Sequence, residues 1–393
     1  MAIIKRKRGN VIYVYEKEYV KVKDGKRQYK EKVIGHLDET GNFIPSRKMR
    51  GKKPEDFPAG IQEITTITKK LRVVEKKNEQ PEKETVEPEI INNSYVKMRQ
   101  GTATNQLTKI RSKKENFDFD PITGKGIAVQ DGFTVSINNF SEVKGLRPST
   151  HKLITALLME FTETGGKDTT TTLPLNKYME LRNIDNETAA RRQVNEDLET
   201  LYSISISFKQ KSKYRKIFDY RDMRLVIDKG IEKGIITCTF HPDFYELMKS
   251  YQVMPMAKKA LGLDDRYNPH AYYFLREFCE HMNMNYFKPN RNLISVTKLL
   301  KSAPELPTYE EVMKEDRHYK RKIIEPFERD LDKLNEIEAI KWHYCHTNGT
   351  PLSDDEIKNM EWEVFNKALI YFELTDYPIR ALPEKTSKKK APK

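Results

Sequence analysis

The pattern of apolar positions after Pro148 predicts a helix, a short strand, two more helices and a β-hairpin. Leucine, isoleucine and phenylalanine recur at helical spacing up to Gly165-Gly166, and the β-branched run Thr169–Leu173 predicts the strand. Pro174 suits the first turn of a short helix. A longer helix follows over Asn186–Leu201, with one apolar face made by Ala190, Val194, Leu198 and Leu201. This order of elements is that of a winged helix–turn–helix domain.

The same order recurs after Asn268. A long apolar-faced helix precedes a short strand over Leu293–Val296 and a short helix over Thr297–Ser302. A long helix is predicted over Asp316–Asn335, which Pro326 should kink or begin anew. Two runs, Ile337–Cys345 and Glu363–Leu374, then predict a hairpin. Two copies in tandem indicate an internal duplication.

The flanking segments have a different pattern. Short β-rich runs fill the first fifty residues, with Asp24-Gly25 as a hairpin turn, and predict a sheet of two or three strands. A polar segment with few apolar residues follows and predicts disorder, as does the lysine-rich C-terminus. The fold class is therefore α+β, and the predicted parts are a basic β-rich arm (1–50), a mostly disordered linker (51–115), winged-helix domains over 116–252 and 253–378, and a basic tail (379–393).

Charge indicates a polyanionic partner. The 393 residues include 71 Lys and Arg against 58 Asp and Glu, a net charge of +13. Residues 1–53 alone hold 16 basic and 6 acidic side chains. An excess of this kind favours nucleic acid first and an acidic membrane surface second. No apolar run reaches the ~18 residues of a membrane span, which excludes an integral membrane protein. With no signal sequence and three scattered cysteines, we expect a cytoplasmic protein.

The outward faces of the two long helices supply the candidate DNA contacts. In the first helix, Arg192 and Asn195 have the chemistry to read guanine and adenine, while Thr188 and Arg191 lie nearer the phosphates. In the second helix the candidates are His318, Arg321, Lys322 and Arg329. A solvated charged face is the alternative interpretation of either helix.

Two lysine-rich segments are interpreted as wing tips that contact phosphates. One is Lys229–Lys233, within a turn-rich loop over 228–234 that joins strands Met223–Ile227 and Ile235–Phe240. The other is 209–216, which contributes Lys211, Lys213, Arg215 and Lys216.

Catalytic constellations are weak in this sequence. It has no Gly-rich phosphate loop and no His-x-His pair of the kind a rolling-circle nickase needs. On a predicted strand, His343 and His346 would face opposite sides, which disfavours a shared metal. Asp228 ends an apolar run as a transposase carboxylate would, but Lys229-Gly230 follows it and favours a turn aspartate. We therefore expect no catalytic residue, no metal and no cofactor.

The tandem pattern over Pro174–Leu201 and Ile294–Leu334 resembles plasmid replication initiators, the Rep proteins with two winged-helix domains. The resemblance implies binding of double-stranded origin DNA by Asn186–Leu201 and Asp316–Leu334, a capacity to dimerise through the first domain, and recruitment of host replication machinery. It implies no catalytic residues. Separately, Val11–Lys48 resembles the N-terminal piece of certain insertion-sequence transposases. Both resemblances indicate a mobile genetic element.

The sequence therefore predicts a non-enzymatic, sequence-specific DNA-binding protein that initiates replication of a plasmid or integrated element. Bound at repeated origin sites, several copies would open neighbouring A·T-rich DNA. Two rival hypotheses stay open. One is a metal-dependent transposase or nickase, for which Asp228 and the N-terminal arm are the hints, and the other is a transcriptional regulator with the same fold.

Overall fold

The computed structural model describes residues 94–378 apart from 111–115, 144, 212–216 and 316, together with the backbone of four strands near the N-terminus. The chain divides into two compact units, Met1–Thr85 and Val86–Lys393, and each is considered by itself. No described helix is long and apolar enough to cross a membrane.

The N-terminal unit contains one antiparallel sheet. Its strands pair in chain order: β1 (Ala2–Arg8), β2 (Val11–Lys23), β3 (Lys26–Leu37) and β4 (Phe43–Pro45). Lys23 pairs with Lys26, so β2 and β3 form the predicted hairpin around Asp24-Gly25. The prediction of two or three strands is wrong, because the sheet has four. β2 is one long strand with a register irregularity between Tyr19 and Lys21.

The first winged-helix domain has the predicted order of elements. They are α3 (Pro148–Glu163), β9 (Thr170–Pro174), α4 (Leu175–Arg182), α5 (Glu187–Ser203), β12 (Val226–Glu232) and β13 (Ile235–Phe240). The Asn186 side chain caps α5 by accepting a hydrogen bond from the Ala189 amide at 2.8 Å. The predicted apolar face of α5 is buried, with Val194 and Leu201 fully enclosed.

The second domain repeats this arrangement. Its elements are α7 (Ala271–Asn285), β15 (Leu293–Ser295), α8 (Val296–Ser302), α9 (Tyr309–Glu315), the π-helical turn η5 (Lys320–Ile324), α10 (Glu325–Glu336), β16 (Ile340–Cys345) and β17 (Leu369–Leu374). In both domains the first short strand pairs with the last strand, giving the sheet orders β12-β13-β9 and β16-β17-β15. The shared topology confirms the tandem winged-helix prediction.

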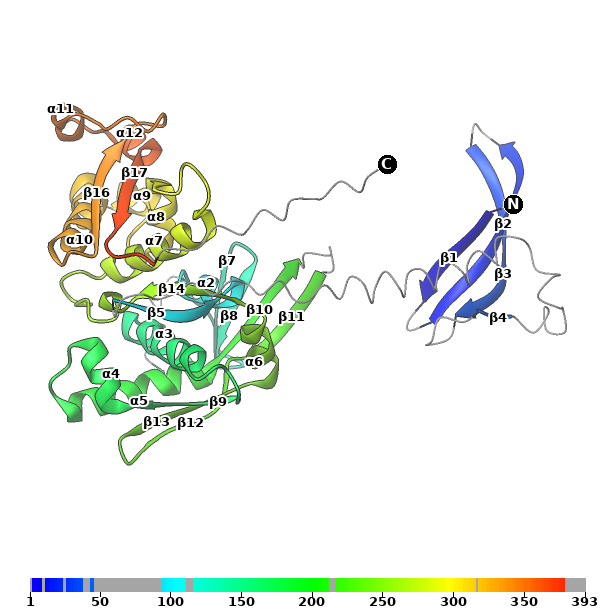
Figure 1. Ribbon diagram of the computed structural model, residues 1–393, viewed down its shortest axis with the longest axis horizontal. Coiled ribbons are helices and arrows are strands. Elements are labelled where there is room, and N and C mark those ends of the chain that lie inside the picture. The colour runs from blue at the N-terminus through cyan, green and yellow to red at the C-terminus, as the bar shows by residue number, and fades with distance from the viewer. Residues whose placement is uncertain are drawn as a thin grey trace, which may run out of the picture. The chain divides into compact units, whose positions relative to one another are not determined.

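The lysine-rich segment over 209–216 does not belong to the wing, so that part of the prediction is wrong. Its first residues, 209–211, belong to β10 (Ile204–Lys211), which pairs with β11 (Ile217–Arg224) in a separate sheet of order β11-β10-β8-β7-β6. That sheet is completed by β6 (Asp118–Asp120), β7 (Lys125–Gln130) and β8 (Phe133–Ile137). The wing itself is the β12–β13 hairpin. Its turn consists of Lys233 and Gly234, both with positive φ, and is shorter than the predicted loop over 228–234. Figure 1 shows the two hairpins as separate projections.

Part of the predicted linker is ordered. Within 51–115, β5 (Tyr95–Gln100) pairs with β14 (Gln252–Ala257), and α2 (Thr102–Leu107) follows it. The prediction of disorder is wrong at these residues because Tyr95, Val96 and Met98 bury their side chains against distant parts of the chain. The short elements α6 (Pro242–Lys249) and η4 (Lys258–Ala260) flank β14.

Two predictions for the second domain are also corrected. The residues after Glu361 form α12 (Trp362–Lys367), preceded by α11 (Asp354–Lys358), and strand structure begins only at Leu369. Phe365 is fully buried and packs edge-to-face on Phe327, which favours the helix. The long helix does not start at Asp316, because Arg317 has φ +58° and η5 precedes α10. Pro326 lies in the first turn of α10, so the helix begins anew there.

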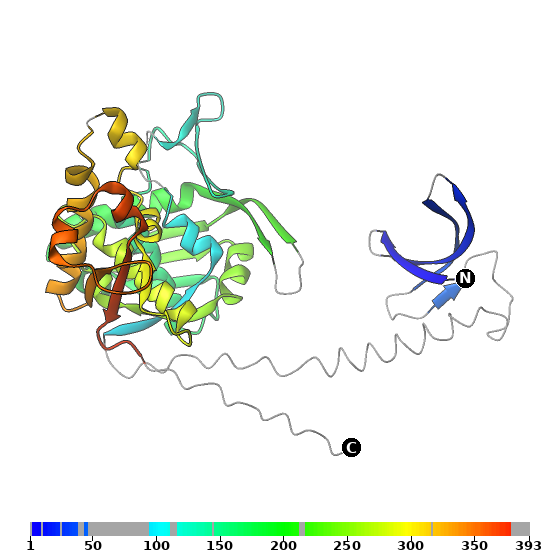
Figure 2. The same ribbon diagram turned by 90° about the horizontal axis from the view of Figure 1, so that it is seen from above.

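Helices α3 and α7 hold the two domains together through buried polar contacts. The His151 Nδ1 and Tyr273 hydroxyl are 2.8 Å apart, and the Thr155 and Tyr272 hydroxyls are 2.7 Å apart. Arg276 donates a further hydrogen bond to Thr155 at 3.1 Å. The β5–β14 ribbon lies beside this contact, with β5 packed on α3 and β14 on α7, as Figures 1 and 2 show.

Two buried histidines make the fold sensitive to acid. Burial and the nearby Arg276 charge lower the pKa of His151 to about 3, and burial lowers the pKa of His270 to about 4. The unfolded chain protonates these rings near pH 6.5, so it binds more protons than the folded chain below that pH. Stability should therefore fall as the pH drops from 6.5 toward 4, by about 1.4 kcal/mol per pH unit for each histidine.

Urea unfolding at several pH values between 7.5 and 4.5 measures this slope. His270→Gln removes one titrating ring and should flatten it, whereas His343→Gln, an exposed position, should leave it unchanged. Equal slopes in the His270→Gln variant and the wild type would contradict the assignment.

Candidate nucleic-acid interface

The exposed face of α5 carries three polar side chains that are uncommitted, meaning that they have no hydrogen-bond or ion-pair partner within the described part of the chain. Thr188, Arg192 and Asn195 are exposed and lie opposite the buried face of Ala190 and Val194. Among the described residues, none of the three side chains has a hydrogen bond or an ion pair. Spaced by four and three residues, they share one side of the helix. Hydrogen-bond donors and acceptors of this reach, without partners in the described part of the chain, are what reading of base edges needs.

The fourth predicted contact on this helix is placed differently. Arg191 is half-buried and forms an ion pair with Glu187 one turn earlier, at 2.7 Å. It lies beside the exposed face of α5, with Arg192 as its neighbour in the chain. That Arg191 lies nearer phosphate than Arg192 stays a prediction.

A buried carboxylate fixes the direction of α5. Asp197 is fully buried and accepts hydrogen bonds from Thr150 at 2.7 Å, Arg147 at 2.9 Å and Ser149 at 3.0 Å. Burial raises the pKa of this carboxyl group, an effect that the three donors oppose. Because all three donors come from the start of α3, the contact ties the middle of α5 to the helix at the domain interface.

Tyr202 extends the exposed face of α5 and was not predicted from the sequence. It lies two helical turns after Asn195, and that periodicity was the available signal. Its ring lies between the Arg224 guanidinium and the Lys229 ammonium, 5.7 and 5.4 Å from the ring centroid. Lys229 also forms an ion pair with Glu199 of α5. Lys229, predicted at a wing tip, therefore holds the base of the wing against the helix.

The basic candidates of the second domain gather at η5. His318, Arg321 and Lys322 are exposed in or just before this turn, at the N-terminal end of α10. Residues Arg317 to Arg321 and Glu325 line a shallow open hollow of about 330 Å³. Tyr319 and Lys320 are anchored to Glu361, with a Lys320–Glu361 distance of 3.2 Å. The hollow is thus predominantly basic and is braced by the residue that precedes α12.

Arg329 lies apart from this basic group. Its Nε donates to the buried Asp330 carboxylate at 2.9 Å. Besides Arg329 itself, the surrounding hollow on α10 is lined by Lys333, Asn268 and four acidic side chains, Glu325, Glu328, Asp332 and Glu336. The structure therefore brings His318, Arg321 and Lys322 together and separates Arg329 from them.

The remaining candidates lie on or beyond the end of β10. Lys211 is the last residue of that strand, and its side chain lies outside the described part of the structure, as do Lys213, Arg215 and Lys216. Their contact with DNA stays a prediction.

The alternative catalytic sites gain no geometric support within the described ranges. No group of three or more His, Cys, Asp or Glu side chains there could hold a metal ion. Asp228 pairs with Thr239 within the β12–β13 hairpin, so its interpretation as a turn aspartate is wrong. His346, one of the two histidines considered above as metal ligands, has its Nε2 atom 3.3 Å from the Glu356 carboxylate.

Comparison with known proteins supports the initiator resemblance. Residues 134–252 match the family model described as initiator replication protein, WH1. Two crystal structures of domains 2 and 3 of RctB are similar to the chain, each with 9% sequence identity and a TM-score of 0.34. The matches cover 69% and 68% of this chain, and 98% and 95% of those chains. No curated protein matches the chain. The resemblance to replication initiators is confirmed over the first winged-helix domain, and the resemblance to transposases stays a prediction.

Removing the Asp197 carboxylate should destabilise this domain strongly. Asp197→Ala leaves the donors on Arg147, Ser149 and Thr150 without their buried acceptor, and should lower the free energy of unfolding by about 3 kcal/mol. Glu196→Ala removes the partly exposed neighbour that also contacts Arg147, and should cost less than about 1 kcal/mol. Urea titration at pH 7 compares the two variants, and equal losses would contradict the role given to Asp197.

Proposed function

We propose that the protein is a sequence-specific, non-enzymatic DNA-binding initiator of replication that acts at repeated sites in an origin. The observation that carries the proposal is the uncommitted face of α5 in a domain that matches the initiator family model. A helix with this position in a winged helix–turn–helix enters the major groove.

In this proposal α5 reads bases. Arg192 donates two hydrogen bonds to guanine and Asn195 pairs with adenine, while Thr188 and Arg191 contact phosphates at the entrance of the groove. The Asp197 contacts hold α5 at a fixed angle to α3, so the base-reading side chains are preorganised before DNA binds. Lys233 at the turn of the wing lies at an exposed tip suited to a flanking phosphate.

The second domain contributes through the N-terminal end of its helix. His318, Arg321 and Lys322 contact phosphates or bases where η5 meets the duplex, and the basic arm near the N-terminus adds further charge. The basic side chains of the Lys211–Lys216 segment also contact phosphates of the DNA backbone. Many phosphates are neutralised together, so binding should weaken steeply with salt.

Occupation of several repeated sites would strain the DNA and open neighbouring A·T-rich sequence, where host replication machinery assembles. Dimerisation through the first domain is part of the same proposal. A transcriptional regulator would use the same α5 surface, and differs in the consequence of binding.

Base reading by Arg192 should be separable from phosphate binding at η5. Arg192→Ala should cost about 1–3 kcal/mol of affinity for the specific site and relax the preference at one base pair. Arg321→Ala combined with Lys322→Ala should weaken binding to all sequences and lower the salt slope by about 2. Arg221→Ala is the control, because this exposed arginine pairs with Asp219 on β11.

These effects are measured by fluorescence anisotropy on a site defined by footprinting, with base-pair variants and salt titrations. An unchanged sequence preference in the Arg192→Ala variant would contradict base reading by α5.

The enzymatic rival predicts a different outcome on the same DNA. Incubation with the DNA that flanks its own gene, with Mg²⁺ or Mn²⁺, should give protection of a repeated array and no nicks. Nicking that Asp228→Asn abolishes would overturn the proposal and make the protein an enzyme. A plasmid-maintenance assay then separates an initiator from a regulator, since only an initiator supports replication.

A further inference from the structure

The exposed face of α5 carries an acidic side chain in line with the residues assigned to bases. Glu199 lies four residues after Asn195 and seven after Arg192, so the three side chains share one side of the helix. The Glu199 side chain is 61% exposed. On a surface that meets DNA, an unpaired carboxylate repels the phosphates. What Glu199 contacts therefore decides whether this surface can enter a groove along its whole length.

The wing neutralises this carboxylate. β12 lies alongside α5, as Figure 1 shows, and the Lys229 ammonium forms an ion pair with the Glu199 carboxylate. The same ammonium lies 5.4 Å from the centroid of the Tyr202 ring, and the Lys229 side chain is only 18% exposed. Two contacts on α5 thus fix the cation. The Glu199–Lys229 pair has no net charge, so it repels phosphates far less than a free carboxylate would.

The ion pair leaves acceptor capacity on Glu199. Lys229 contacts the Oε1 atom, and no other group in the described part of the chain forms a hydrogen bond or an ion pair with either carboxylate oxygen. An ionised carboxylate accepts hydrogen bonds at about four sites and donates none. The Oε2 atom can therefore accept from a donor that approaches the exposed face of α5.

Cytosine is the base that matches such an acceptor in the major groove. Its N4 amino group is a donor, whereas guanine and thymine present acceptors there, and adenine presents the N7 acceptor beside its N6 donor. A carboxylate therefore gains a hydrogen bond opposite cytosine and faces a repelling acceptor opposite each of the other three bases. A neutral side chain at this position would lack that selectivity.

The helical rise places Glu199 within reach of the same run of base pairs. Residues of an α-helix are spaced by about 1.5 Å along its axis, and stacked bases by about 3.4 Å. Arg192 and Asn195 are thus about 4.5 Å apart along the axis, and Glu199 lies about 6 Å further on. The distance from Asn195 to Glu199 corresponds to about two base pairs.

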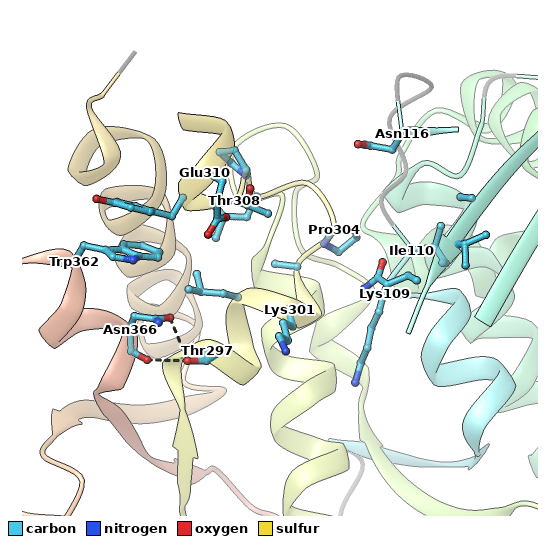
Figure 3. A pocket seen from close by; sticks show the side chains of 18 residues that line it. Lys109, Ile110, Asn116, Thr297, Lys301, Pro304, Thr308, Glu310, Trp362 and Asn366 are labelled. Atoms are coloured by element: carbon cyan, nitrogen blue, oxygen red, sulfur yellow. Dashed lines mark hydrogen bonds between the residues drawn. The ribbon is translucent and has the colours of Figure 1, made fainter. Parts of the chain in front are cut away.

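The Glu199 site is a surface and not a cavity. The groove drawn in Figure 3, with a volume of about 570 Å³, is lined by residues that include Lys301, Glu310 and Trp362, and by none from α5 or β12. Side chains that project from a helix suit the floor of a DNA groove, whereas a small molecule needs a concave site. The exposed face of α5 therefore fits a duplex better than a small ligand.

We propose that Glu199 is a specificity-determining residue of α5. Its carboxylate accepts a hydrogen bond from the N4 amino group of a cytosine about two base pairs from the base that Asn195 contacts. Lys229 is a positioning residue, because it holds the carboxylate in place and cancels its charge. This assignment rests on the proposed function, since it takes α5 as the helix that enters the major groove.

Selection of bound duplexes from a library of randomised base pairs tests the assignment on the full chain. Glu199→Gln should change the preferred base at one position from cytosine to adenine, because a glutamine amide pairs with the N6 and N7 atoms of adenine. The preference at the other positions should stay as in the wild type. Glu246→Gln is the matched control, because Glu246 forms an exposed ion pair with Lys249 on α6 of the same domain, and it should leave every position unchanged.

Lys229→Met tests the positioning role. The change removes the cation, so the unpaired carboxylate should weaken binding to all duplexes by roughly threefold and leave cytosine preferred by a smaller margin. The double variant Glu199→Gln with Lys229→Met has no charge left at the pair, and its binding to duplexes of random sequence should return to within about twofold of the wild type. Fluorescence anisotropy measures these affinities, and melting temperatures show whether each variant folds.

Specific binding with an unchanged base preference in the Glu199→Gln variant would overturn the role of Glu199 and leave the proposed function standing. A double variant that binds as weakly as Lys229→Met would mean that Lys229 itself contacts phosphate, which overturns its role as a positioning residue. Lower melting temperatures without a change in base preference would make the pair a structural contact only, and would also overturn the assignment. A wild type without any sequence preference would count against the proposed function first, and the assignment would fall with it.

Discussion

The buried contact between α3 and α7 is the constraint on which the arrangement of the two domains depends. Polar side chains in that contact are enclosed and paired, as with His151 and Tyr273, so parting the helices would expose or orphan them. Apolar surfaces alone would tolerate sliding, whereas hydroxyl, imidazole and guanidinium groups have one satisfied arrangement. The interface therefore fixes the position of α5 in the first domain relative to η5 in the second.

The segment between η4 and α7 carries this constraint to the helix–turn–helix elements. Asp265 accepts from the fully buried Lys152 of α3 and from Arg182 at the end of α4, at 3.0 Å in the second case. A few residues later Asn268 donates to Asp330 of α10 at 3.2 Å. Burial lowers the pKa of Lys152 to about 8, with the Asp265 charge opposing the shift. One short segment thus contacts α3 and α4 of the first domain and α10 of the second.

The features that the sequence could predict were local. The Asn186 cap and the buried face of α5 can be predicted from residue types and from the helical spacing of apolar positions. The same helical spacing places Tyr202 on the outward face. Pairing partners are not local. β5 and β14 lie far apart in the sequence. The residues of β5 are ordered because they pair with β14 and bury their apolar side chains, and neither contact can be predicted from the local sequence. The same holds for β10. Its lysine-rich end was predicted as part of the wing, but β10 pairs with β8 and β11 in a different sheet.

The two copies differ in the charge of their long helices. The exposed face of α5 is polar along its first three turns, whereas the hollow on α10 is lined by Glu325, Glu328, Asp332 and Glu336 together with Arg329 and Lys333. The hollow on α10 thus has more acidic than basic side chains in its lining. Burial also raises the pKa of Glu328, which accepts a hydrogen bond from Tyr344 at 3.0 Å and so serves the fold of its own domain. The two copies therefore share the topology of the domain and differ in the surface chemistry of their long helices.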